Sequence, residues 1–111
     1  MMSKALIDTY ESSAKIMEQM LIAARQSAWE KVTELEQSYM LKIEVIKTLE
    51  QNLRLQSETL NAEEHSRKQK LVQKILADDG EIRNLLYPVM HRITDMIFDA
   101  QLHARIPPDA I

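Results

Sequence analysis

The chain has 111 residues and a formal net charge of −3, and 28% of its residues are charged. This length fits one domain, which we place at residues 1–111, with room for one core but not for a deep catalytic cleft as well. One glycine and three prolines are too few for the turns of an all-β fold, and the acidic balance argues against a nucleic-acid partner. The absence of cysteine excludes a disulfide framework and a thiol nucleophile.

Neither a secretion signal nor a membrane span is visible in the sequence. The N-terminal stretch has no long apolar segment before Asp8, unlike a signal peptide. The longest apolar run, Met20 to Ala24, is far too short to span a bilayer. We therefore expect a cytoplasmic protein without membrane insertion.

Apolar residues spaced three and four apart predict two helices in the first half of the chain. The first, over about residues 4–25, carries the stripe Leu6, Tyr10, Ala14, Met17, Leu21 and Ala24. Ser27 then follows as a candidate N-cap. The second helix, over about residues 28–58, carries the stripe Val32, Leu35, Tyr39, Ile43, Ile46, Leu49 and Leu53.

A third helix is predicted to begin at Asn61, because Glu64 lies three residues later, at the spacing of a capping box. Its apolar stripe is Leu71, Ile75, Ile82, Leu86, Val89, Ile93 and Met96. Asp78-Asp79-Gly80 and Pro88 interrupt the helical signal, but the stripe keeps its phase across both. We therefore predict one continuous helix over about residues 62–102, kinked near Pro88, and a short non-helical tail. The fold class is all-α, an antiparallel bundle of three long helices.

The predicted helices differ in length. At about 1.5 Å per residue, the first is roughly 33 Å long, the second roughly 46 Å, and the third is longer still. The first helix then cannot cover the whole seam between the other two. Four apolar residues near the end of the third helix should lack neighbours within the chain, which is typical of a partner site: Met96, Ile97, Phe98 and Leu102.

No group of side chains predicts catalysis. His91 and Asp95 lie one helical turn apart, a spacing that gives a surface hydrogen bond more often than a metal site. The acidic Asp78–Glu81 cluster would need a cleft to shift its pKa values before it could act as an acid or base. The basic run His65–Lys70 reads as a solvated helix face. We predict that the chain is not an enzyme and holds no metal or cofactor.

Two blocks of the sequence resemble the FliT family of flagellar export chaperones. The first runs from Trp29 to Tyr39 and continues to Ile43-Glu44, and the second runs from Ile75 to Pro88. The order and spacing of the blocks carry the resemblance, which covers roughly residues 5–98. In the family the second block lies within one long helix.

The resemblance implies a cytoplasmic chaperone of type III flagellar export. Such a protein binds the C-terminal region of the filament-cap protein, prevents its premature assembly, and delivers it to the export ATPase complex and the export gate. Some members also bind the flagellar master transcription activator when they are free of cargo. Two alternatives stay open from the sequence: a regulatory protein that sequesters this activator, and a structural bundle that self-associates, for example as a homodimer.

For the cargo we predict helix-in-groove recognition along the second and third helices. The candidate groove residues are Tyr39, Ile43, Ile46, Leu86, Val89, Met90 and Ile93, and the alternative for each of them is a place in the bundle core. For docking on the export gate, the resemblance points to the first helix, where Ile7 and Tyr10 lie three residues apart and so side by side. The alternative for Tyr10 is inward packing with Leu6 and Ala14.

Overall fold

The computed structural model describes the backbone of residues 2–105 and the side chains of residues 3–90 and of Arg92. Three helices account for almost all of it: α1 (Met2–Arg25), α2 (Trp29–Leu55) and α3 (Ala62–Arg105). Within residues 2–105 there is no strand, so the all-α prediction is confirmed. The predicted non-helical tail lies outside the described residues.

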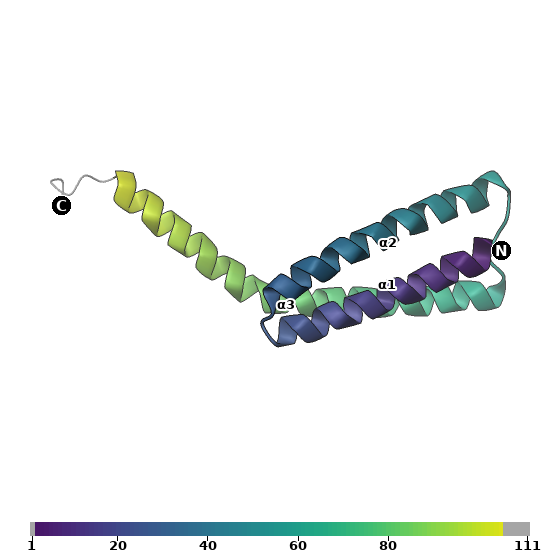
Figure 1. Ribbon diagram of the computed structural model, residues 1–111, viewed down its shortest axis with the longest axis horizontal. Coiled ribbons are helices and arrows are strands. Elements are labelled where there is room, and N and C mark those ends of the chain that lie inside the picture. Colours follow the sequence, from purple (N-terminus) through teal and green to yellow (C-terminus); the bar gives the residue numbers. More distant parts are fainter. Residues whose placement is uncertain (1, 106–111) are drawn as a thin grey trace.

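The helices run up, down and up, with α1 as the common neighbour (Figure 1). α1 packs against both α2 and α3. Among the described residues, no Cα atom of α2 comes within 8 Å of one in α3. This differs from the seam that the sequence predicted between the second and third helices, because α1 lies along both of them and keeps their backbones apart.

Ion pairs set the register between α1 and α3. Three of them cross from α1 to α3, with nitrogen–oxygen distances of 2.9, 3.7 and 2.7 Å: Glu11–Arg67, Glu18–Lys74 and Arg25–Glu81. Each joins a residue of α1 to the residue 56 positions later, and successive pairs are seven residues apart. α1 and α3 are therefore parallel and keep one register, with the heptad spacing of paired helices. Exposed pairs of this kind contribute little stability each, so their main effect is alignment.

The hydrophobic core is centred on α1. All six residues of the predicted first stripe are buried, with Leu6 only 1% exposed. α2 supplies Ile46 and Leu53 to the buried set, and α3 supplies three more residues: Leu71, Ile75 and Ile82. The rest of the α2 stripe is half-buried. Within the described part of the chain, α1 is covered from two sides, whereas α2 and α3 each pack against α1 alone.

Each interhelical turn contains, two residues after the end of the helix, a serine in the left-handed conformation. Ser27 has a φ of 57° and Ser57 a φ of 56°. After α1, the Ala28 N–H donates to the Ala23 carbonyl at 2.9 Å, and an equivalent bond after α2 runs from Glu58 to Leu53. These are Schellman caps with serine in place of the usual glycine. Ser27 thus belongs to the C-terminal cap of α1. The prediction that it is the N-cap of the second helix is wrong, because Ala28 takes that position. α2 also ends three residues earlier than predicted, at Leu55.

The start and the middle of α3 follow the sequence closely. The predicted capping box is formed: the Glu64 N–H donates to Asn61 Oδ1 at 2.8 Å, and the Asn61 N–H donates to Glu64 Oε1 at 3.1 Å. The helix continues through Asp78-Asp79-Gly80, as predicted. Ion pairs one turn away hold both aspartates in helical geometry, Asp78 with Lys74 at 3.1 Å and Asp79 with Arg83 at 3.0 Å.

The C-terminal part of α3 projects beyond the other two helices (Figure 1). Arg25, the last residue of α1, is level with Glu81, so the later turns of α3 extend past the end of α1. α3 contains Pro88 and, in Figure 1, changes direction as it leaves the bundle. The predicted unpartnered side chains from Met96 to Leu102 belong to this projection and lie outside the described side chains. Among the described residues, no helix is both long and apolar enough to cross a membrane.

Replacement of Leu6 by alanine should destabilise the bundle strongly, because Leu6 is a core residue that is only 1% exposed. Such large-to-small changes in a core typically lower the free energy of unfolding by about 2–5 kcal/mol. The matched control is Leu41→Ala on α2, where the leucine is 70% exposed, and it should change stability by about 0.5 kcal/mol or less. Urea unfolding followed by circular dichroism measures both, and equal losses would contradict the core described above.

Candidate partner-binding surface

The α2 residues of the predicted groove all face the core. Ile46 is buried, and Tyr39 and Ile43 are half-buried and pack against the core cluster. Burial raises the pKa of the Tyr39 hydroxyl, and the nearby Asp79 carboxylate of α3 raises it further. The Asp79 carboxylate therefore acts on Tyr39 across the gap between α2 and α3, so the two residues lie at about the same level of the bundle.

The α3 residues of the predicted groove lie further along the molecule. Leu86 and Val89 are half-buried, whereas Met90 is 57% exposed; Ile93 lies outside the described side chains. Leu86 is seven residues beyond Asp79, which is level with Tyr39, so about 10 Å along the helix axis separates the two levels. The structure therefore does not bring the predicted residues into one cluster. Their role in binding stays a prediction.

Several large apolar side chains outside the predicted stripes are exposed. They are Ile22, Met40, Leu41, Val45, Leu55, Leu76, Leu85 and Tyr87. The sequence signal that could have found them is an apolar residue out of phase with the main stripe of its helix. Met40 on α2 and Leu76 on α3 matter most, because their helical spacing places them beside the facing sides of these two helices: Met40 is three residues from Ile43, and Leu76 is three residues from Asp79.

One polar cluster joins all three helices. The Tyr10 hydroxyl of α1 donates a hydrogen bond to Glu50 of α2, and Lys68 Nζ of α3 lies 3.0 Å from the same carboxylate. The lysine nitrogen also lies 5.5 Å from the centroid of the Tyr10 ring, over its face, at cation–π distance. Lys68 therefore reaches over α1 to α2.

The electrostatics of this cluster favour a neutral tyrosine beside a charged carboxylate. Burial raises the pKa of Tyr10 strongly, and its hydrogen bond to Glu50 raises it further. Burial alone would raise the pKa of Glu50, but the hydrogen bonds from Tyr10 and Lys68 outweigh this and lower it. At neutral pH the cluster holds one carboxylate and one ammonium group, with the phenol as donor.

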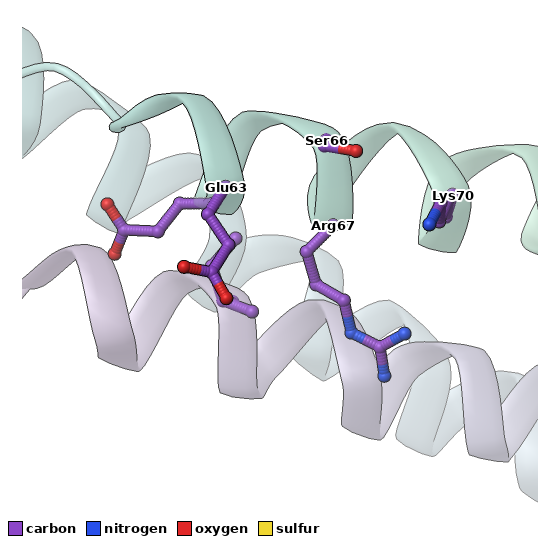
Figure 2. A pocket seen from close by; sticks show the side chains of 6 residues that line it. Glu63, Ser66, Arg67 and Lys70 are labelled. Carbon is purple, nitrogen blue, oxygen red and sulfur yellow. The ribbon is translucent and has the colours of Figure 1, made fainter.

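The two predicted docking residues lie in different environments. Tyr10 is only 9% exposed, in the core, which is the alternative that the sequence left open. Ile7 is half-buried and lines a cleft of about 440 Å³ between α1 and the first turns of α3. Figure 2 shows this cleft, with Arg67 extending from α3 towards α1. Of the two predicted docking residues, Ile7 is thus the more accessible, and the docking role of both stays a prediction.

Two residues of the basic run His65–Lys70 are engaged in ion pairs with other helices. Arg67 donates two hydrogen bonds to Glu11, at 3.1 and 2.9 Å, and Lys68 is paired with Glu50. This run therefore aligns helices and does not form a free basic patch. Among the described residues, no three histidine, aspartate or glutamate side chains gather as they would around a metal ion.

Comparison with known proteins identifies the family to which this chain belongs. The family model described as flagellar protein FliT matches residues 7–105. The chain belongs to the FliT family. A crystal structure of flagellar protein FliT from Bordetella bronchiseptica is similar to it, with a TM-score of 0.72 and 28% sequence identity over 82% of this chain and 97% of that chain. No curated protein matches the sequence significantly.

Family membership confirms the resemblance that the two blocks suggested, and the FliT crystal structure has the same all-α fold. The matched region, residues 7–105, spans all three helices and includes the projecting part of α3. The flagellar assignment therefore holds for the bundle as a whole and not only for the Trp29–Tyr39 and Ile75–Pro88 blocks.

Two replacements of Tyr10 should distinguish the contribution of its ring to stability from that of its hydroxyl. Tyr10→Ala removes a buried ring and should lower the free energy of unfolding by about 3 kcal/mol or more. Tyr10→Phe keeps the ring and loses one hydrogen bond, which is worth about 1 kcal/mol. Urea unfolding measures both, and an unchanged stability of Tyr10→Ala would contradict the core placement of this residue.

Acidification should weaken the bundle partly through Glu50. Its pKa in the folded chain is lowered from the ordinary value of 4.5. On acidification, Glu50 is therefore protonated in the unfolded chain at a higher pH than in the folded chain. The stability that the ionised Glu50 contributes begins to be lost below about pH 4.5 and is gone once the pH has fallen below the lowered pKa of the folded chain. Glu50→Gln should have a flatter stability profile between pH 5 and pH 3, measured by urea unfolding. Parallel profiles for the two proteins would contradict the lowered pKa.

Proposed function

We propose that this protein is a cytoplasmic chaperone of type III flagellar export. It binds the filament-cap protein, prevents its premature assembly, and delivers it to the export ATPase complex and the export gate. Membership of the FliT family over residues 7–105 is the observation that carries this proposal. The described residues add a consistent feature, a thin bundle with large apolar side chains left exposed on α2 and α3.

The cargo site that we propose is a trough with α1 as its floor and α2 and α3 as its walls. Half-buried Tyr39 and Ile43 lie on one wall, and exposed Met40 borders them. Half-buried Val72 and exposed Leu76 lie on the other wall, and Leu86, Val89 and Met90 follow where α3 leaves the bundle. An amphipathic cargo helix would lay its apolar face along these side chains. Methionines at such a surface adapt to partners of irregular shape.

Docking on the export machinery needs a surface that cargo leaves free. The outer side of α1 near Ile7, beside the cleft with α3, is the candidate. Binding of the master transcription activator in the absence of cargo is a further expectation of the resemblance, and so is the absence of enzymatic activity.

The C-terminal region of the filament-cap protein should carry the binding determinant. In a titration of this chain with labelled cap protein, the full-length cargo should bind, whereas a cargo that lacks its C-terminal region should bind at least tenfold more weakly. Met90→Ala is a suitable probe of the trough, because Met90 is 57% exposed and its loss should weaken binding without lowering the melting temperature.

A control for the probe is Leu55→Ala, which removes an even more exposed side chain (75%) at the other end of the bundle. Equal binding by the full-length and shortened cargo would contradict the proposed cargo region. Capture of the transcription activator in place of the cap protein would favour the regulatory alternative, and a stable oligomer that binds neither would favour the structural one.

A further inference from the structure

The contact between Glu50 and Lys68 lies at one end of the trough between α2 and α3. Among the described residues it is the ion pair that joins these two helices, whose backbones do not approach each other. Lys68 crosses above the ring of Tyr10, so the pair spans the trough over its α1 floor. The two side chains are 33% and 29% exposed, which places the pair at the surface and not in the core.

The two walls also approach each other electrostatically at a second place, further along the trough. Tyr39 lies near enough to Asp79 for the carboxylate to raise the pKa of the tyrosine. From Glu50 to Tyr39 is eleven residues along α2, and from Lys68 to Asp79 is eleven residues along α3. The two approaches therefore share one antiparallel register, and about 16 Å, or three helical turns, separates them.

Apolar side chains line α2 and α3 between the two approaches. Ile43 and Val72 are half-buried there, and Met40 and Leu76 stand exposed beside them. On α2, Met40, Ile43 and Glu50 share one side of the helix at steps of three and seven. On α3, Lys68, Val72 and Leu76 share one side at steps of four. The ion pair thus belongs to the same two helix sides as the exposed apolar side chains.

We propose that the Glu50–Lys68 pair is an autoinhibitory closing contact at this end of the trough, which holds α2 and α3 together over Tyr10 and which a cargo helix must break to lie along the full length of the trough. This rests on the proposed cargo site. Because the pair is partly exposed, water and salt weaken it, and it opens without loss of the core. After Lys68 moves away, Glu50 keeps the Tyr10 hydroxyl as a hydrogen-bond donor, so the bundle retains a partner for the carboxylate.

The distance between α2 and α3 tests the closing contact without cargo. The chain has no cysteine, so cysteines placed at exposed Gln51 and Gln69 carry the only spin labels. Double electron–electron resonance should give a longer and broader distance distribution for Lys68→Met than for the parent protein. Lys74→Met is the matched control, because Lys74 pairs with Glu18 and Asp78 and not with α2, and its distribution should stay unchanged. Identical distributions for Lys68→Met and the parent would overturn the proposal.

Cargo affinity tests the inhibitory role. Lys68→Met should bind the full-length cap protein more tightly, by up to about fivefold, which is the most that a partly exposed ion pair can contribute. Lys74→Met should bind like the parent. The exchange Glu50→Lys with Lys68→Glu restores a pair in the opposite sense and should return both distance and affinity to parental values.

Unchanged or weaker binding by Lys68→Met would overturn the inhibitory role. If the parent protein does not bind the cap protein at all, the proposed function fails, and the label distance alone then decides whether the pair closes the trough. A second prediction guards against a trivial loss of folding: the helical circular dichroism signal of Lys68→Met should match that of the parent, since neither member of the pair is buried.

Discussion

α1 is buried between two neighbouring helices, and the positions of α2 and α3 follow from this burial. α1 supplies most of the buried apolar residues, and α2 and α3 reach the core through it. A helix covered on two sides needs a broad apolar face, and α1 has one, with small residues such as Ala14 and Ala24 that let its neighbours approach. As a consequence, α2 and α3 are not fully covered by other helices, and exposed apolar side chains remain on both.

Charged side chains then decide how the helices are aligned. Pairs from Glu11 to Arg67 and from Arg25 to Glu81 run along one flank of α1 and keep α3 parallel to it. On the other side, the Tyr10 hydroxyl and Lys68 converge on Glu50 and connect α2 to α3. Each contact is weak by itself. Together they select one register for helices whose apolar stripes would tolerate several.

The open sides of α2 and α3 also make the bundle suitable as a binding protein. A chaperone for an unassembled subunit needs an apolar surface that is open in the free protein, yet such a surface is a hazard for aggregation. In this bundle the core is concentrated around α1, while the open sides of α2 and α3 stay accessible to a partner.

Local sequence patterns were enough to predict the three helices, the capping box at Asn61, the unbroken course of α3 through Gly80 and the family, because each of these depends on residues close together in the chain or on their order. Only the tertiary structure decided that Tyr10 is buried and that Met40 and Leu76 are exposed. Helical periodicity tells which residues share a side of a helix, but not how many neighbours that side will have. The number of neighbours depends on α1 lying along both α2 and α3, and no local pattern encodes that choice.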